Sequence, residues 1–277
     1  MQRSLRVAAL QLKVTLDRAD TLRRARDLID RAAREGCELV SLPECFAGKY
    51  GVQHFAKWQE VLPTSPTDAD ANSGGAAMLA EAASQHGIIL SGGVIEREPA
   101  GKRLFNTMPV YGRSGELLAR YRKVHLSRVL GITSEADVLT AGSETSHFPV
   151  RDNIHAGLAC CFDLRFPTWL ARYGPHAAET VDVLLAPSAF LDVTGRDHWH
   201  LLCRRAALDL QCFVVAPNIA FDSQDEVPLY GHSIIVDPWG RVLAECGPAS
   251  DDLAIADLDG AVLDDVRAKL PLGAWVE

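Results

Sequence analysis

Apolar residues gather in short runs along the chain, and longer amphipathic stretches separate these runs. Runs of aliphatic residues bounded by turn residues predict buried strands. The stretches 20–36 and 74–87 instead place their apolar residues on one face of a helical repeat, and each ends in glycine. They predict two helices, with Asp20 capping the first.

The remaining pattern predicts a chain in which strands and helices alternate. A turn at 113–115 joins two strand-like runs in an expected hairpin, a short helix is expected at 167–174, and a longer one at 196–211. Alternation of this kind is typical of an α/β fold, and the hairpin favours mixed sheets. No linker or internal repeat interrupts the chain, so we expect a single domain over 1–277. Strands are expected at 5–12, 37–44, 88–96, 105–112, 116–124, 153–162, 181–190, 212–220, 232–240, 241–246 and 252–259.

Charge and composition narrow the possible partners. The net charge is −8, the pI is near 5.6, and no basic run occurs, so neither nucleic acid nor an anionic membrane is an expected partner. Gln11 and Lys13 interrupt the first apolar run, which therefore predicts a strand and not a signal peptide. No run reaches the ~18 apolar residues of a membrane span. Seven cysteines without a CxxC spacing are typical of a reduced, cytoplasmic protein.

Two adjacent cysteines stand where a predicted strand passes into a predicted helix. A residue at such a turn presents its side chain beside the free N–H groups of the next turn, the geometry of a nucleophile elbow. Strand alternation places Cys160 and Cys161 on opposite faces, so at most one of them can be a nucleophile. The alternative is that both are core residues.

A thiol nucleophile needs a base, and two charged residues at strand ends are candidates. Glu44 follows Pro43 where a buried strand ends, and Lys123 follows another strand in a chain that has few lysines. Each alone could be a solvated or paired charge. His198 and His200 are two residues apart on a helix and face different ways, and no third ligand accompanies them at a useful spacing. No metal centre is therefore expected.

Three blocks in this order carry a resemblance to a known family. The segments "LPECF" at 42–46, "YRKVHL" at 121–126 and "CFDLRFP" at 161–167 resemble the signature blocks of the nitrilase superfamily of carbon–nitrogen hydrolases. The similarity continues through most of the chain. It is greatest to the amidase branches that include deaminated glutathione amidase and omega-amidase.

The resemblance implies a fold and a set of roles. The fold would be an α-β-β-α sandwich that pairs with a second subunit as a homodimer or higher oligomer. The catalytic residues would be Glu44, Lys123 and Cys161, since the family's cysteine immediately precedes an aromatic–Asp pair. Cys160 would then be a packing residue facing away. Glu135, in "SEADVLTAG", would be an accessory glutamate, although Ala141 replaces the family's usual proline.

These roles imply a cofactor-free hydrolysis. Glu44 takes the thiol proton, Cys161 attacks an amide carbonyl, and Lys123 with the backbone N–H of Phe162 stabilises the oxyanion. Water then cleaves the thioester. The expected substrate is a small carboxylic-acid amide, with release of ammonia.

Three further residues are candidates for substrate binding. Arg165 could hold a carboxylate through its two-pronged guanidinium, and Tyr50 lies in a loop that resembles the family's substrate loop. His200 stands where relatives carry glutamate. The alternative for Arg165 is an internal ion pair with Asp163 or Glu135. Ser127, Arg128 and Thr168 also depart from the family pattern, which leaves the substrate open.

The same candidate residues are also compatible with other functions. Nitrile hydrolysis, N-carbamoyl-amine hydrolysis and acyl transfer to an amine use the same triad. A catalytically idle interaction module on this fold is an alternative of a different class, although an idle copy has no need of Glu44, Lys123 and Cys161 together.

Overall fold

A computed structural model describes residues 4–68, 74–99, 101–129 and 133–274. Its strands form two large mixed sheets and one two-stranded ribbon. The first sheet has the order β16 (Asp252–Asp259), β1 (Ser4–Gln11), β2 (Leu39–Ser41), β4 (Ile89–Ser91), β6 (Leu104–Tyr111), β5 (Val94–Arg97) and β3 (Gln59–Glu60), with β7 (Leu117–Arg122) also pairing with β6. The second has the order β10 (His147–Arg151), β11 (Ile154–Leu158), β12 (Val183–Leu185), β13 (Phe213–Ala216), β14 (Ile234–Val236) and β15 (Val242–Glu245), and the ribbon pairs β8 (Arg128–Val129) with β9 (Thr133–Ser134).

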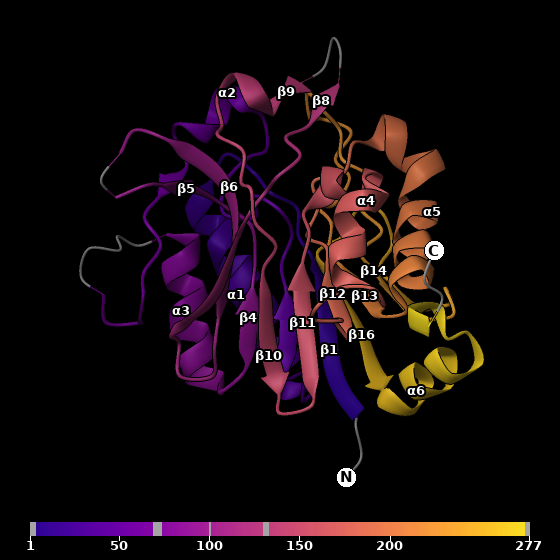
Figure 1. The fold of residues 1–277 in the computed structure, drawn as a ribbon. Helices are drawn as coiled ribbons and strands as arrows, with labels where there is room; N and C mark the ends of the chain where they lie inside the picture. The colour runs from indigo at the N-terminus through magenta and orange to yellow at the C-terminus, as the bar shows by residue number, and fades with distance from the viewer. Residues whose placement is uncertain (1–3, 69–73, 100, 130–132, 275–277) are drawn as a thin grey trace.

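Helices cover the outer faces of the two sheets. Figure 1 shows α1 and α3 on one side of the molecule and α4 and α5 on the other, with the sheets between them. The helices are α1 (Arg18–Arg34), α2 (Val52–Phe55), α3 (Gly75–His86), α4 (Pro167–Leu170), α5 (Asp192–Leu210) and α6 (Gly260–Lys269), and short 3-10 turns are η1 (Glu135–Asp137), η2 (Cys161–Arg165), η3 (Ala171–Tyr173) and η4 (Leu272–Ala274).

The alternation along β1 explains why the layers form. Leu5, Val7 and Ala9 pack into a hydrophobic cluster shared with the second sheet, whereas Ala8 and Leu10 pack with α1 and α3. Successive side chains of a strand point to opposite faces, so a strand that is apolar throughout needs cover on both sides. The architecture is the expected α-β-β-α sandwich with mixed sheets.

The strand expected at 88–96 is two strands. Gly92 and Gly93 separate β4 from β5, and β6 lies between them in the sheet. The backbone at Gly93 passes so close to another turn that an added Cβ would lie 2.5 Å from the Cα of Glu44. Glycine is therefore required here by close approach. Strand β10, helix α6 and the short α2 were not expected from the sequence.

The cap of α1 is also different from the expected one. Helix α1 begins at Arg18, and its N-cap is Asp17, whose Oδ1 accepts the backbone N–H of Asp20 at 3.0 Å. Asp20 lies in the first turn and pairs with Arg24, with 2.7 Å between Nε and Oδ2. The prediction of Asp20 as cap is wrong because the helix starts one turn earlier than its apolar stripe.

This placement predicts a difference between the two aspartates. Asp17→Ala should lower the free energy of unfolding by about 1 kcal/mol, since it leaves a first-turn N–H without its acceptor. Asp20→Ala removes only ion pairs that water still reaches and should cost less. Urea denaturation of both variants measures the difference. A larger loss for Asp20→Ala would contradict the assignment of the cap.

Candidate active site

The two charged residues expected at strand ends meet the expected accessory glutamate in the interior. Lys123 follows β7, and its Nζ lies 2.7 Å from Oε1 of Glu44 and 2.7 Å from Oε2 of Glu135. All three side chains are fully buried, at 0% relative exposure. The structure thus brings together Glu44, Lys123 and Glu135 from segments far apart in the chain, in a set of one cation and two carboxyl groups.

The turn that carries Glu44 is held by backbone contacts with Gly93. The Gly93 N–H donates to the carbonyl of Pro43 at 2.9 Å, and the Phe46 N–H donates to the carbonyl of Gly93 at 3.0 Å. Cys45 between them has a φ of 54°, in the left-handed region. The tight turn directs the Glu44 carboxyl group toward the second sheet, where its Oε2 accepts the Ala189 N–H at 2.7 Å.

A buried asparagine that the sequence analysis missed joins the two glutamates. Asn106 on β6 donates its Nδ2 to Glu44 at 2.7 Å and to Glu135 at 3.1 Å. Glu135 is held further by the backbone N–H of Ser127, at 2.6 Å. A polar residue within the apolar run of a central strand was the available signal, because a buried amide needs partners.

Burial and mutual attraction determine the charges of this set. Burial disfavours the charged form of Glu44, but Lys123 outweighs it and holds the pKa of the carboxyl group below its ordinary value. Burial likewise opposes the charge on Lys123, yet Glu135 and Glu44 raise its pKa well above the usual range. At neutral pH the set therefore contains an ammonium group and a Glu44 carboxylate able to accept a proton.

Cys161 occupies the predicted elbow. It follows β11, opens η2, and has a φ of 46°, which a non-glycine residue adopts only where the surrounding structure enforces it. Its N–H donates to the carbonyl of Pro187 at 3.0 Å. Burial and the nearby Glu44 raise the pKa of its thiol well above the usual value. The resting residue is therefore a neutral thiol beside a carboxylate base.

Cys160 lies near this set as well. Its thiol and that of Cys161 both help to hold the pKa of Glu44 below its ordinary value. Regular β geometry ends at Leu158, before the two cysteines, so strand alternation does not determine which way either side chain points. Burial also raises the pKa of the Cys160 thiol well above the usual value.

Asp163 fixes the shape of the elbow. Its carboxylate accepts the Cys160 N–H at 3.0 Å, the Tyr121 hydroxyl at 2.7 Å and the His125 N–H at 2.9 Å. The His125 ring lies against the same carboxylate, with Nδ1 at 2.7 Å. The Asp163 carboxylate, in the third signature block, is thus engaged in contacts with other residues of the protein.

Cys161 opens onto a cavity lined mainly by aromatic and aliphatic side chains, with a few polar ones among them. Arg165 lies half-buried in its wall, and its guanidinium lies 3.1 Å from Nδ1 of His198 and over the ring of Phe190 at 5.0 Å. Among the described residues no carboxylate pairs with Arg165, so the predicted alternative of an ion pair with Asp163 or Glu135 is wrong. The full lining is Tyr50, Ser127, Val129, Cys161, Phe162, Arg165, Ala189, Phe190, Leu191 and Thr194.

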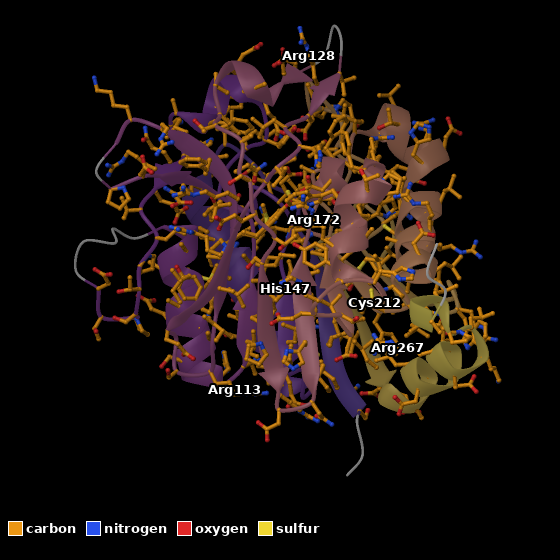
Figure 2. All side chains as sticks on the ribbon, viewed as in Figure 1. Arg113, Arg128, His147, Arg172, Cys212 and Arg267 are labelled. Carbon is orange, nitrogen blue, oxygen red and sulfur yellow. The ribbon has the colours of Figure 1, made fainter. Side chains whose placement is uncertain are left out.

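The departures from the family pattern lie in different places. Ser127 lines the cavity, and its Oγ is 3.4 Å from the Tyr50 hydroxyl. Arg128 lies at the outer end of the molecule, exposed, as Figure 2 shows. Thr168 is exposed. His200 does not line the cavity but bonds Glu245 at 2.9 Å, so this placement does not support its predicted role in substrate binding.

Comparisons with known proteins identify the family of this chain. The model of the carbon-nitrogen hydrolase family matches residues 6–268. The chain belongs to this family. It is 36% identical over 273 residues to the omega-amidase NIT2 of Homo sapiens, which covers 97% of this chain and 94% of that protein. The omega-amidase NIT2 of Danio rerio is 36% identical over 271 residues, covering 96% and 92%.

A solved structure shows the same fold. Saccharomyces cerevisiae Nit3, a member of branch 10 of the nitrilase superfamily, superposes with a TM-score of 0.85 at 33% identity, covering 98% of this chain and 95% of the yeast chain. The protein is therefore a hydrolase of carbon–nitrogen bonds with the nitrilase-superfamily fold. Within the residues described, no helix has the length and apolar character needed to span a bilayer.

The buried ion set predicts that removal of its cation lowers the free energy of unfolding and that removal of one carboxyl group as well restores part of the loss. Lys123→Met leaves two carboxyl groups facing each other without a cation and should cost about 3–5 kcal/mol of unfolding free energy. Adding Glu135→Gln should restore part of this loss, since it removes one of the two like charges.

Denaturant unfolding of the single and double variants tests this account, with Lys102→Met at an exposed position as the control. An Lys123→Met variant as stable as Lys102→Met would show that the three groups are not coupled.

Proposed function

We propose that this protein is a cysteine-dependent amidohydrolase that acts on a small carboxylic-acid amide, as an omega-amidase does, and releases ammonia. The observation that carries the proposal is the cavity itself. At its inner end a neutral thiol lies beside a buried carboxylate and ammonium group, and in its wall an arginine has no carboxylate partner among the residues described.

The reaction follows from these groups. The thiol of Cys161 gives its proton to Glu44 as its sulfur bonds to the amide carbon. The oxyanion is stabilised by the Lys123 ammonium and the N–H of Phe162. When the carbon–nitrogen bond breaks, Glu44 returns the proton to the leaving ammonia. Glu44 then deprotonates the water that attacks the thioester, and the acid leaves as the thiol is restored.

Glu135 has a supporting part in this scheme. It contacts the ammonium of Lys123 beside Glu44 and takes two further hydrogen bonds, from Ser127 and Asn106. A lysine held between two carboxyl groups keeps its position and charge when Glu44 becomes protonated. Glu135 therefore acts as an accessory residue that preserves the cation through both half-reactions.

The cavity also indicates the form of the substrate. Arg165 would bind the free carboxylate of the substrate through two parallel hydrogen bonds, and Tyr50 would contact the chain between carboxylate and amide. This arrangement favours the monoamide of a short dicarboxylic acid. No cofactor takes part in the proposed reaction.

Two features of the surroundings belong to the same proposal. We expect a homodimer. Leu201 and Leu208 lie one above the other on α5 and are 65% and 45% exposed, and contact with a second copy of the chain would remove these apolar side chains from water. We also expect the enzyme to work in the cytoplasm, where a thiol nucleophile stays reduced. Light scattering on the purified protein reports the oligomeric state.

A substrate screen with ammonia detection tests the proposed function. The panel pairs a dicarboxylic monoamide with a neutral amide of equal length, a nitrile and an N-carbamoyl amine. Ammonia release from the monoamide should be fastest. Cys161→Ala and Glu44→Gln should reduce turnover by several orders of magnitude, while Cys160→Ala should keep most of it.

Each other outcome of the screen has a definite meaning. Preference for the nitrile or the carbamoyl amine would assign the same triad to another reaction. A folded but inactive parent whose thiols ignore a thiol-reactive probe would indicate an interaction module. An active Cys161→Ala beside an inactive, folded Cys160→Ala would exchange the roles of the two cysteines.

Substitution of Arg165 tests the carboxylate contact separately. Arg165→Lys keeps the positive charge but loses the planar fork, so KM for the monoamide should rise about tenfold or more while KM for the neutral amide changes little. Steady-state kinetics on both substrates measure this. Equal losses on the two would assign Arg165 a structural role against His198 and Phe190.

A further inference from the structure

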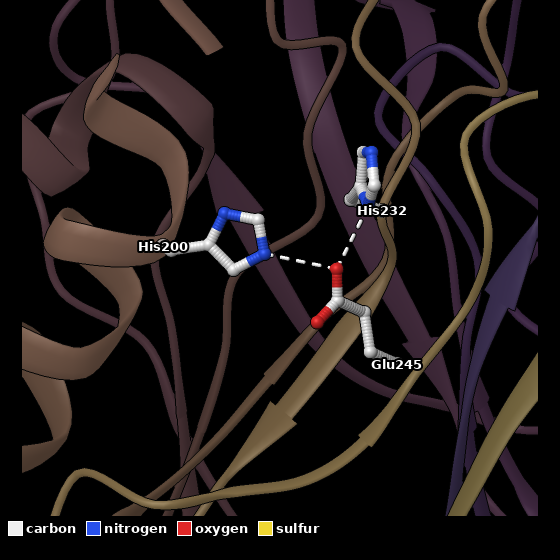
Figure 3. A group of neighbouring side chains, drawn as sticks. All are labelled: His200, His232 and Glu245. Carbon is white, nitrogen blue, oxygen red and sulfur yellow. Dashed lines mark hydrogen bonds and ion pairs between the residues drawn. The ribbon is translucent and has the colours of Figure 1, made fainter. Parts of the chain in front are cut away.

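Outside the cavity, two histidines and a glutamate converge on one point at the surface. The Oε1 atom of Glu245 lies 2.9 Å from Nε2 of His200 and 2.7 Å from Nδ1 of His232. Figure 3 shows both rings directed at this oxygen. The three ligand atoms lie within 4.8 Å of one another. No other group of at least three histidine, cysteine or acidic side chains meets this geometry in the described part of the chain.

The fold holds these residues in place through its backbone. Glu245 ends β15 opposite Ile234 of β14, and the Cys246 N–H donates to the carbonyl of Ser233 at 2.9 Å, so the β14–β15 pairing places Glu245 beside His232. His232 is joined to α5 as well, because the indole N–H of buried Trp199 donates to its carbonyl at 2.7 Å. His200 is the next residue on that helix. The arrangement is therefore set before any ion binds.

The chemistry of the donors selects a class of ligand. Two imidazole nitrogens and one carboxylate oxygen form a ligand set that zinc takes in proteins, with a fourth position left for water. Tetrahedral coordination at zinc bond lengths places neighbouring donor atoms about 3.3 Å apart. Each nitrogen would therefore move away from the Glu245 oxygen by about half an ångström, within a set of three ligand atoms that already lie within 4.8 Å of one another. The three side chains are 25–36% exposed, so an ion can reach them without opening the core.

From this geometry we propose that His200, His232 and Glu245 bind a divalent transition-metal ion of the zinc class, which joins α5 to the β14–β15 hairpin. None of the three lines the cavity that contains Cys161. The site is thus separate from the proposed hydrolytic reaction and would act on the stability of the second sheet and its covering helix. Each imidazole would bind the ion through the nitrogen that now faces Glu245 and carry its one proton on the other ring nitrogen.

The absence of a third ligand near His198 and His200 was the reason to expect no metal from the sequence. The structure supplies that ligand from elsewhere. His232 and Glu245 come from segments 32 and 45 residues beyond His200 in the numbering of the chain, and the sheet brings them to the exposed side of the helix. His198, two residues before His200, turns instead to Arg165.

Zinc titration of the metal-free protein tests the proposal. The measurement uses Cys161→Ala as the parent, so that the thiol of the cavity does not compete for the ion, and a chromophoric zinc chelator reports the free metal. We expect one site per chain. His200→Ala, His232→Ala and Glu245→Gln should each weaken it by at least about tenfold, the effect typical of losing even an outer contact of a metal ligand.

A matched control and a second readout separate this site from loose surface binding. His155→Ala removes an exposed histidine elsewhere and should leave the affinity unchanged. Cobalt, which takes the same ligands, should give the visible absorption of a tetrahedral ion in the parent and lose it in His200→Ala. Zinc should raise Tm in the parent but not in that variant.

Two results would overturn the proposal. One is a parent that binds no stoichiometric zinc or cobalt, which would make the cluster a hydrogen-bonded network only. The other is an affinity in the folded His200→Ala protein equal to that of the parent and of His155→Ala. Because His200 lies on a helix surface, its variant keeps the test decisive even where His232→Ala fails to fold.

Discussion

The buried ammonium of Lys123 between two carboxyl groups is the constraint on which the site depends. A lone charge at this depth is strongly unfavourable, and its two partners come from segments 79 residues before it and 12 residues after it in the chain. The ion set therefore forms only when β2, β7 and the turn at Glu135 have reached their final places. Asn106 adds an amide that bonds both carboxyl groups and holds them at a common distance from the lysine.

The second constraint is the elbow at Cys161, and it depends on Asp163. The left-handed backbone of a non-glycine residue is unfavourable by itself, so the surrounding contacts have to maintain it. Asp163 does so by accepting hydrogen bonds from Cys160, Tyr121 and His125 at once. Tyr121 is tied in turn to Trp169 of α4, so the helix that follows the elbow is part of the same support.

The buried ion set and the His200–His232–Glu245 cluster differ in their exposure to solvent. At the Glu44–Lys123–Glu135 set, the protein replaces water completely, and the charges of Glu44 and Lys123 stabilise each other. At His200, His232 and Glu245, water remains in contact with all three side chains, so an ion could exchange there. The first arrangement suits proton transfer between buried groups, and the second suits binding at a surface.

The sequence by itself determined the α/β class, most strands and helices, and the candidates Glu44, Lys123 and Cys161, because hydrophobic periodicity and short signature blocks are local properties of a chain. The three-dimensional structure decided what depends on contacts between distant segments. Gly93 beside Glu44, Asn106 between two glutamates, and Arg165 without a carboxylate partner among the described residues are of this kind. Regular strand geometry ends before Cys160, so alternation along the strand could not place its side chain, and His200 meets its partners only where β14 and β15 pair. The local sequence pattern predicts on which face of its own helix or strand a residue lies. Packing between elements then determines which residues of other elements it contacts.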